Sequence, residues 1–186
     1  QQRFEKAGVS KDKISLAGNI KLDNSVPQLS DSEKSDLAQK LKISLDKPII
    51  IFGSTHAGEE ELCLEVTKEL WQDRPDLQCL LVPRHPERFD GIAEMLKKEK
   101  LIFNRSSEIH EEMPSENFLL IDEMGLLMKL YAICDIAIVA GSFTPDIGGH
   151  NILEPSFYGK AMLYGPWIYK QPGFHQMNLE FEAGIQ

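Results

Sequence analysis

The chain has 186 residues, of which 42% are hydrophobic and 26% are charged, proportions that are ordinary for a soluble globular protein. This length suffices for one sizeable core, or for one domain with an appendage. The formal net charge of -9 argues against a general nucleic-acid binder, whose domain would normally carry a basic face. No apolar run reaches the ~18 residues that span a bilayer, and no signal peptide opens the sequence.

The three cysteines, Cys63, Cys79 and Cys134, are far apart, within apolar stretches, and no Cys-x-x-Cys pair is present. Neither a zinc knuckle nor a disulfide scaffold is indicated, so we expect buried, reduced thiols in a cytosolic protein. No initiator methionine is present, and a helix is expected to begin near Phe181, close to the last residue. Both ends suggest a piece of a longer protein.

The N-terminal part predicts short elements joined by polar chain. They are a helix over residues 3–8, a strand over 13–19, a linker over 23–31 and a helix from Ser30 to about Leu41. Apolar runs and helical patterns then alternate. The predicted strands are 48–53, 77–82, 101–103, 118–121, 136–140 and 161–164, and the predicted helices are 59–71, 87–98, 124–134 and 152–158.

Short, continuously apolar strands that alternate with helices indicate a largely parallel sheet covered on both faces. The predicted fold class is therefore α/β, a Rossmann-like doubly wound parallel sheet. The helix over 59–71 is expected to bury a stripe of Leu62, Val66 and Leu70. Ligands of such sheets bind outside the carboxyl ends of the strands. Four loops that follow those ends carry residues able to bind a ligand.

Residues 148–155 (GGHNILEP) form the most informative of these loops. Two glycines let backbone N–H groups approach a ligand, and a helix expected to start here would favour an anion such as a nucleotide phosphate. Asn151 and Glu154 lie three residues apart, where the carboxylate suits a pair of sugar hydroxyls. A capping box, with Asn151 as N-cap and Glu154 reaching back, is the structural alternative.

Residues 53–60 follow the first strong strand. The hydroxyls of Ser54 and Thr55, with N–H groups at the helix start, suit a phosphate. The structural alternative is a plain N-cap followed by the helix-favouring acids Glu59, Glu60 and Glu61. The segment is not a P-loop, because the Gly-Lys-Ser/Thr ending is missing.

Residues 83–88 (PRHPER) form a loop that two prolines stiffen. It places Arg84 beside His85, and arginine suits bidentate recognition of a carboxylate or phosphate. The alternative is a surface arginine paired with Glu87. In the fourth loop, Met124 and Gly125 would let a flat ring such as a nucleobase lie against the backbone, although an ordinary strand-to-helix turn has the same pattern.

Histidines and acids near these loops raise the question of a metal. His56, His85, His150, Glu59 and Glu154 could in principle surround a divalent ion. No His-Glu-x-x-His or comparable spacing is present, and a helix N-terminus disfavours a cation, so no metal site and no cofactor are predicted. A Ser/His/Asp hydrolase is not supported either, since no Gly-x-Ser-x-Gly turn occurs.

Taken together, the four loops resemble 3-deoxy-D-manno-octulosonic acid (Kdo) transferases, which move Kdo from CMP-Kdo onto lipid A precursor in lipopolysaccharide assembly. The segments that carry the resemblance are GSTH (53–56), GEEE (58–61), PRHPER (83–88), Met124-Gly125 and GGHNILEP (148–155), with AGNIK (17–21) near the start. The likeness covers nearly the whole chain but only the C-terminal half of such an enzyme. It implies the donor-binding domain of a two-domain GT-B glycosyltransferase.

The resemblance also implies roles for particular residues. Arg84 would contact the CMP phosphate or base, and Met124 and Gly125 would lie against the cytosine. Asn151 and Glu154 would hold the ribose and phosphate end. The full set of implied donor-binding residues is Ser54, Thr55, His56, Pro83, Arg84, His85, Met124, Gly125, Gly148, Gly149, Asn151 and Glu154. Leu126 departs from the family, in which an acid often follows the Met-Gly pair.

The remainder of the enzyme is expected elsewhere. The resemblance places the catalytic carboxylate, the acceptor site for lipid A precursor and the peripheral membrane contact in the N-terminal half, so no catalytic residue is assigned in this chain. Residues 1–29 would be an interdomain segment and linker, and residues 30–186 the nucleotide-sugar-binding domain. The whole enzyme would act at the cytoplasmic face of the bacterial inner membrane, whereas this piece would be soluble.

Two other functions fit the same residues. One is a different GT-B nucleotide-sugar enzyme, such as a UDP-sugar transferase or an epimerase. The other is a non-catalytic nucleotide-binding module. Competition between CMP and UDP would separate the first from a Kdo transferase, and an N-terminal half with its own carboxylate would exclude the second.

Overall fold

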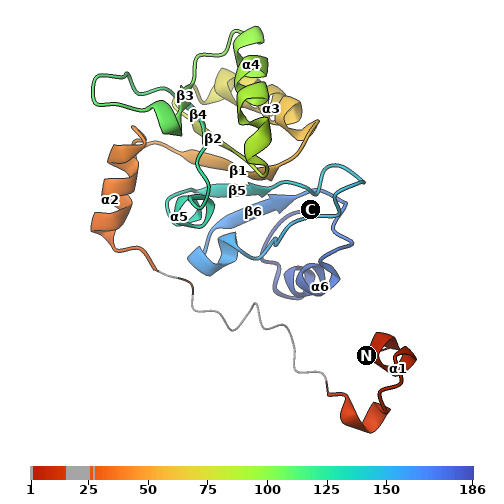
Figure 1. Cartoon of the computed structure of the whole chain (residues 1–186). Coiled ribbons are helices and arrows are strands. Elements are labelled where there is room, and N and C mark those ends of the chain that lie inside the picture. Colours follow the sequence, from red (N-terminus) through yellow and green to blue (C-terminus); the bar gives the residue numbers. More distant parts are fainter. Residues whose placement is uncertain (1, 16–25, 27) are drawn as a thin grey trace.

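The computed structural model describes residues 2–15, 26 and 28–186. Within them, a six-stranded parallel sheet has the strand order β3-β4-β2-β1-β5-β6 (Figure 1). The strands are β1 (Ile49–Thr55), β2 (Gln78–Pro83), β3 (Asn104–Arg105), β4 (Phe118–Leu120), β5 (Ile136–Val139) and β6 (Ala161–Tyr164). The prediction of a doubly wound parallel sheet is confirmed.

Helices cover this sheet or precede it. The α-helices are α1 (Gln2–Lys6), α2 (Asp31–Lys40), α3 (Glu59–Asp73), α4 (Phe89–Lys98), α5 (Leu127–Tyr131) and α6 (Pro172–Phe181). Short 3₁₀ helices are η1 (Lys11–Lys13), η3 (Pro86–Arg88), η4 (Ser106–Glu108) and η5 (Pro155–Tyr158). Of the strand predicted over 13–19 and the linker predicted over 23–31, residues 16–25 and 27 lie outside the described residues.

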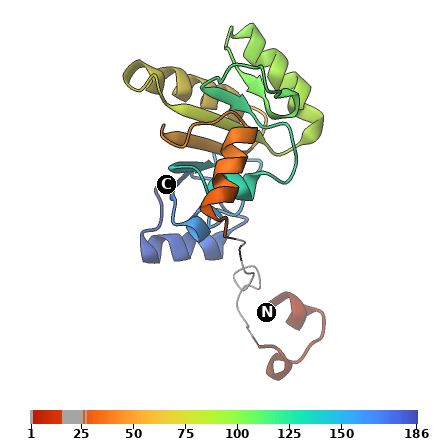
Figure 2. The same cartoon turned by 90° about the vertical axis from the view of Figure 1, so that its left-hand side faces the viewer.

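The apolar runs of the central strands fill two layers because alternate side chains point to opposite faces. Ile49 and Ile51 of β1 pack with α2 and α5, whereas Ile50 and Phe52 pack with α3 and α4. In Figure 2, α2 (orange) lies beside α5 (teal) on one face, and α3 and α4 lie together in Figure 1. A third cluster joins β5 and β6 to α6 through Val139 and Phe174.

The start of α2 agrees with its sequence. Ser30 is the N-cap, and its Oγ accepts the N–H of Glu33 at 3.3 Å. The Glu33 carboxylate in turn accepts the N–H of Ser30 at 2.8 Å, which completes a capping box. The predicted helix from Ser30 to about Leu41 is confirmed.

Cys63, Cys79 and Cys134 are buried and unbonded to one another, as expected. Burial raises the pKa of Cys79 to about 11 and that of Cys134 to about 12, because the thiolate would be poorly solvated. The thiols therefore behave as small apolar side chains.

Two boundary predictions were wrong for reasons of packing. Residues 101–103 form no strand: Ile102 is 72% exposed, and pairing with β4 starts only at Asn104. No helix begins near Phe181, because α6 starts at Pro172 and ends at Phe181, and Ile185 then forms a parallel bridge with Leu163.

The face that α3 buries also differs from the predicted stripe. Leu62 is 41% exposed, and Val66 and Leu70 are only partly buried. The buried residues of this helix are Glu59, Glu60, Cys63, Leu64 and Thr67. Two acids thus occupy the inner face at the helix start, where the sequence favoured solvated positions.

β1 lies between β2 and β5. The strands that follow β1 in the chain are first added on the β2 side, and the chain then crosses over to add β5 on the other side of β1. This is the topological switch point, where the loops on either side of β1 diverge and leave a crevice for a ligand. The loops after β1 and β5 flank it, which directs attention to residues 54–58 and 141–150.

Candidate functional site

A bulge ends β1 at the switch point. Gly53 pairs with Val82 and Thr55 with Pro83, which leaves Ser54 as the extra residue, in the left-handed region at φ 60°. Thr55 has no exposed surface, and its hydroxyl has no hydrogen-bond partner among the described residues. In this structure the Thr55 hydroxyl therefore lies below the surface, whereas Ser54 is partly exposed.

Three histidines from three loops meet beside this bulge. The Nε2 atoms of His56 and His150 lie 2.7 Å apart, and the two rings are nearly parallel, with an interplanar angle of 11°. The ring of His85 stands edge-on to His56, with centroids 5.0 Å apart. The loops after β1, β2 and β5 therefore converge, as their positions at one edge of a parallel sheet predicted.

The contact between His56 and His150 requires one ring nitrogen to donate and the other to accept, so at least the accepting ring is neutral in this arrangement. Burial lowers the pKa of His150 to about 4, and the neighbouring charges of His56, Arg84, Lys170 and His85 act in the same direction. Burial, followed by the charge of His85, also lowers the pKa of His56. The pair is thus held uncharged at neutral pH.

This shift predicts a loss of stability in mild acid. The unfolded chain binds a proton at His150 near pH 6.5, whereas the folded chain binds it only near pH 4, so the free energy of unfolding falls as pH falls through this window. We expect a loss of about 2 kcal/mol between the two pH values, which is less than the full shift would give because the ring is partly exposed. Little change is expected above pH 7, because there the ring is neutral in both the folded and the unfolded chain. Urea unfolding across pH 4–7 measures it. His150→Gln should flatten the dependence, and an equal slope in both proteins would contradict the assignment.

Buried carboxylates join the three loops. Glu59 accepts the N–H of His56 at 2.9 Å and that of Gly141 at 2.8 Å. Glu60 binds both terminal nitrogens of Arg88, at 2.7 and 3.0 Å. Sequence reasoning missed both roles, because acids in a first helical turn are ordinarily solvated and favourable there.

Arg84 lies at the same edge with its side chain exposed. Its backbone N–H donates to the carbonyl of Thr55 at 3.0 Å, which fixes the PRHPER loop to the end of β1. Glu87, the partner of Arg84 in the structural alternative, instead lies 3.5 Å from His85 Nδ1. Within residues 2–15, 26 and 28–186, Arg84 forms no ion pair, so its guanidinium is available to an anion.

The GGHNILEP loop differs from its prediction. No α-helix starts at Asn151: residues 152–154 form a turn, and the 3₁₀ helix η5 begins at Pro155. The Asn151 side chain accepts the N–H of Leu153 at 3.2 Å, a local turn that competes with helix formation, and no side chain caps η5. Neither the helix N-terminus nor the capping box is therefore present.

The two glycines of this loop are needed by the protein itself. Gly148 and Gly149 have φ values of 79° and 84°. A Cβ on Gly148 would overlap the Tyr169 ring, and one on Gly149 would lie 3.0 Å from Ile168. The N–H of Gly149 already donates to the carbonyl of Gly141 at 2.7 Å, so it is not available to a phosphate.

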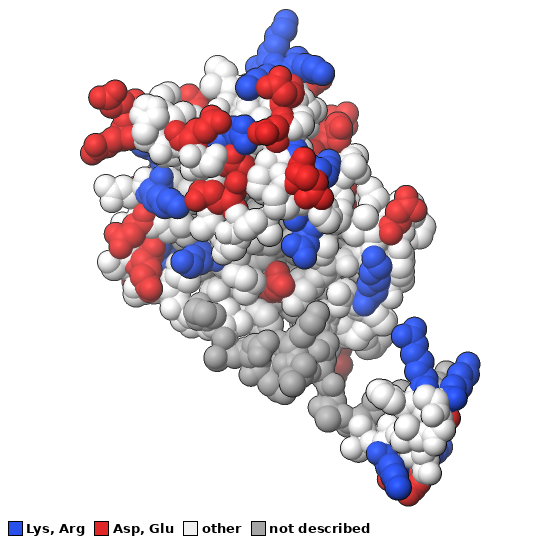
Figure 3. All heavy atoms as spheres, in the orientation of Figure 1, with Lys and Arg blue, Asp and Glu red and all other residues white. Residues whose placement is uncertain are grey.

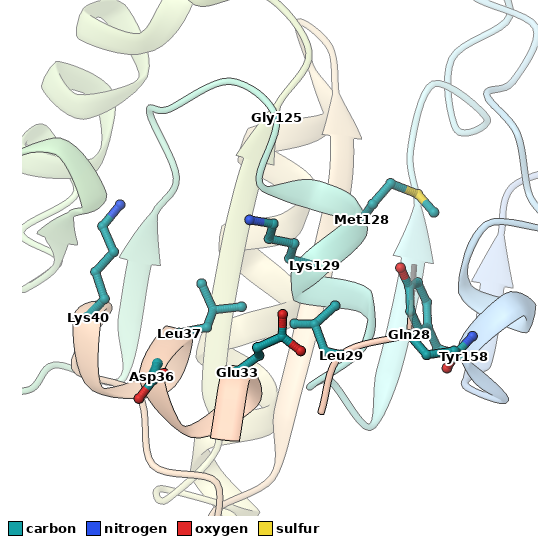
Figure 4. A pocket seen from close by; sticks show the side chains of 10 residues that line it. All are labelled: Gln28, Leu29, Glu33, Asp36, Leu37, Lys40, Gly125, Met128, Lys129 and Tyr158. Carbon is teal, nitrogen blue, oxygen red and sulfur yellow. The ribbon is translucent and has the colours of Figure 1, made fainter. Parts of the chain in front are cut away.

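Met124 and Gly125 lie in the turn before α5, which starts only at Leu127 rather than at Met124. Met124 is 58% exposed, and Gly125 borders a pocket of about 440 Å³ between α2, α5 and Tyr158 (Figure 4). None of the three clustered histidines lines this pocket. Leu126, the residue after the Met124-Gly125 pair, packs against the core.

Surface charges and possible metal ligands bear on two of the expectations from the sequence. Acidic and basic side chains are intermixed on the face shown in Figure 3. Across the described part of the chain, no group of three His, Cys, Asp or Glu side chains is placed to hold a metal ion. None of the helices seen there is both long and apolar enough to cross a bilayer.

Known proteins resemble this chain along its whole length. The 3-deoxy-D-manno-octulosonic acid transferase of Haemophilus influenzae is 40% identical over 188 residues, and that of Chlamydia trachomatis serovar A is 35% identical over 187 residues. The matches cover all of this chain but only 43% and 42% of those relatives. No protein-family model matches the sequence.

One solved structure covers most of both chains. It is described as the C-terminal CMP-Kdo binding domain of WaaA from Acinetobacter baumannii, and it is 32% identical to this chain with a TM-score of 0.74. The match includes 83% of this chain and 80% of that one. This chain belongs to the Kdo transferase family. Its fold is that of the C-terminal domain of a Kdo transferase, and it spans less than half of the length of the two Kdo transferases compared above.

Proposed function

We propose that this chain is the donor-binding part of a glycosyltransferase that transfers Kdo from CMP-Kdo to lipid A precursor in lipopolysaccharide synthesis. Relatives named Kdo transferases match it from end to end, and the similar solved structure is named for binding CMP-Kdo. In this proposal, residues 30–186 form the donor domain and residues 1–29 lead to it from the rest of the enzyme.

The observation that carries the proposal is the convergence of three loops at the switch point. His56, His85 and His150 meet there, and Arg84 extends from the same edge without an ionic partner in the described part of the chain. An uncharged, partly buried histidine pair beside a free guanidinium suits an anionic ligand that is also a hydrogen-bonding sugar nucleotide.

Arg84 would bind the phosphate of CMP. In the transfer, the bond between the anomeric carbon of Kdo and a phosphate oxygen breaks, so negative charge builds up on the departing CMP. A planar guanidinium on a loop whose backbone is fixed to the end of β1 can stabilise this charge by paired hydrogen bonds. Because the N–H of Gly149 is engaged within the protein, Arg84 carries more of this role than the sequence suggested.

Other contacts to the donor follow the family pattern. Met124 and Gly125 would lie against the cytosine, and Asn151 and Glu154 would hold the ribose. Ser54, at the tip of the bulge, would face the sugar. The base that deprotonates the acceptor hydroxyl, the lipid A precursor site and the membrane contact would belong to the rest of the enzyme, at the cytoplasmic face of the inner membrane.

Titration of the chain with CMP in a calorimeter tests the proposal. The unmodified chain should bind CMP, and Arg84→Ala should weaken binding by about tenfold or more, the value of a lost charge-assisted hydrogen bond. Arg74→Ala is the matched control. Arg74 follows α3 and precedes β2, so it lies near the amino ends of the strands, away from the proposed site, and it pairs with Asp76. Its affinity should equal that of the unmodified chain.

Two outcomes would count against the proposal. If the unmodified chain binds no CMP, the donor site is wrong. If UMP competes as well as CMP, a transferase that uses UDP-sugars becomes the better assignment. Equal affinity of Glu154→Ala and the unmodified chain would remove the ribose contact alone.

A further inference from the structure

We propose that Glu59 is a positioning residue that holds His56 and His150 against each other, and so keeps the loops after β1 and β5 in one binding surface. The inference deepens the proposed function and rests on it for the identity of the ligand. The dependence of the histidine pair on Glu59 can be tested without any ligand.

The contacts of Glu59 run across the switch point. Its Oε2 accepts two N–H groups, from His56 at 2.9 Å and from Gly141 at 2.8 Å. Its Oε1 accepts the N–H of Phe143 at 3.1 Å. Gly141 and Phe143 follow β5, more than 80 residues further along the chain, so one carboxylate joins both walls of the crevice.

Both N–H groups that donate to Oε2 are close to a histidine ring. One belongs to His56 itself. The other belongs to Gly141, against whose Cα the His150 ring lies so closely that a Cβ would be 2.6 Å from its Cδ2 and 2.9 Å from its Nε2. The same oxygen thus sets the backbone of both partners in the contact between His56 and His150.

An ordinary capping role does not explain this arrangement. Glu59 is the first residue of α3, but its carboxylate bonds none of the described N–H groups within that helix. The residue is only 1% exposed, and a buried carboxylate is costly unless its oxygens are bonded. Three N–H groups and the positive end of a 15-residue helix compensate for this cost.

Glu59→Gln is the direct test, with Glu61→Gln as the matched control. Glutamine keeps the size of the side chain but presents an amide NH₂ where an acceptor is needed, so at least one N–H loses its partner. Glu61 is exposed two residues further along the same helix. Two readouts are compared: the nitrogen and proton spectra of the imidazoles, and the affinity for CMP measured by calorimetry.

We expect Glu59→Gln to abolish the spectral signature of the hydrogen bond between His56 and His150 and to weaken CMP binding by about tenfold. Glu61→Gln should change neither readout. An unchanged histidine pair in folded Glu59→Gln protein would overturn the inference. An altered pair with CMP affinity within about twofold of the original would overturn its link to binding.

The test remains decisive if the unmodified chain binds no CMP, since the imidazole spectra then judge Glu59 while the proposed function fails. If Glu59→Gln does not fold, hydrogen exchange of the unmodified protein replaces it. The N–H groups of His56 and Gly141 should exchange slowly, because a buried carboxylate holds them. Exchange as fast as that of exposed loop residues would overturn the positioning role.

Discussion

Replacing Arg88 with methionine is expected to lower the free energy of unfolding by about 3 kcal/mol, because it leaves the carboxylate of Glu60 buried without its partner. Both terminal nitrogens of Arg88 bind Glu60, whose side chain is 1% exposed, and 28% of the Arg88 side chain is exposed. Hydrogen bonding to Glu60 raises the pKa of Arg88. Denaturation by urea, monitored by circular dichroism, measures the effect.

The pair offers an internal control. The double variant Arg88→Met with Glu60→Leu should recover most of the lost stability, since two apolar side chains replace a desolvated ion pair. Lys68→Met breaks the exposed pair with Glu99 and should change stability by less than about 1 kcal/mol. An Arg88→Met variant as stable as Lys68→Met would show that the buried pair contributes nothing.

Gly165→Ala is expected to destabilise the fold by about 3 kcal/mol, because there is no room for a methyl group between two backbone segments. A Cβ on Gly165 would overlap the carbonyl oxygen of Ser142 and would lie 2.6 Å from its carbonyl carbon and 2.9 Å from the Cα of Phe143. These are backbone atoms and cannot turn aside as the end of a long side chain can.

The local hydrogen bonds prevent the two segments from separating. The N–H of Gly165 donates to Ser142 Oγ at 2.8 Å, and the N–H of Trp167 donates to the Ser142 carbonyl at 2.9 Å. Gly91→Ala is the control: Gly91 lies exposed on α4 with open space around it, so alanine there should stabilise by roughly 0.5 kcal/mol. Thermal unfolding of both variants separates them, and similar melting temperatures would contradict the predicted overlap.

Most of the sheet was predictable because its central strands are short apolar runs in the sequence. Ile49 to Phe52 and Phe118 to Ile121 are buried on both faces, so continuous hydrophobicity alone located them. The edge strand β3 was missed because Asn104 and Arg105 are polar, whereas Leu101 and Phe103 before them pack against the core without pairing to a strand. An apolar run in a sequence indicates side-chain burial, but it does not indicate which backbone groups form the hydrogen bonds of a strand.

The site was predictable as a set of loops but not in its internal contacts. Parallel strands place His56, His85 and His150 at one edge, and the structure brings them together. The partners of Glu59 follow β5, far along the chain, and no local pattern specifies such a distance. The turn around Asn151 was mistaken for a helix start because Asn, Glu and Pro at those spacings serve both structures.

The buried cysteines give each layer of the domain its own chemical reporter. Cys63 and Cys79 pack between the sheet and the pair α3 and α4, whereas Cys134 packs on the opposite face. Burial raises the pKa of all three thiols, so an alkylating reagent reacts with them only when the surrounding layer opens. Their relative labelling rates under native conditions therefore distinguish the opening of one layer from the unfolding of the whole domain.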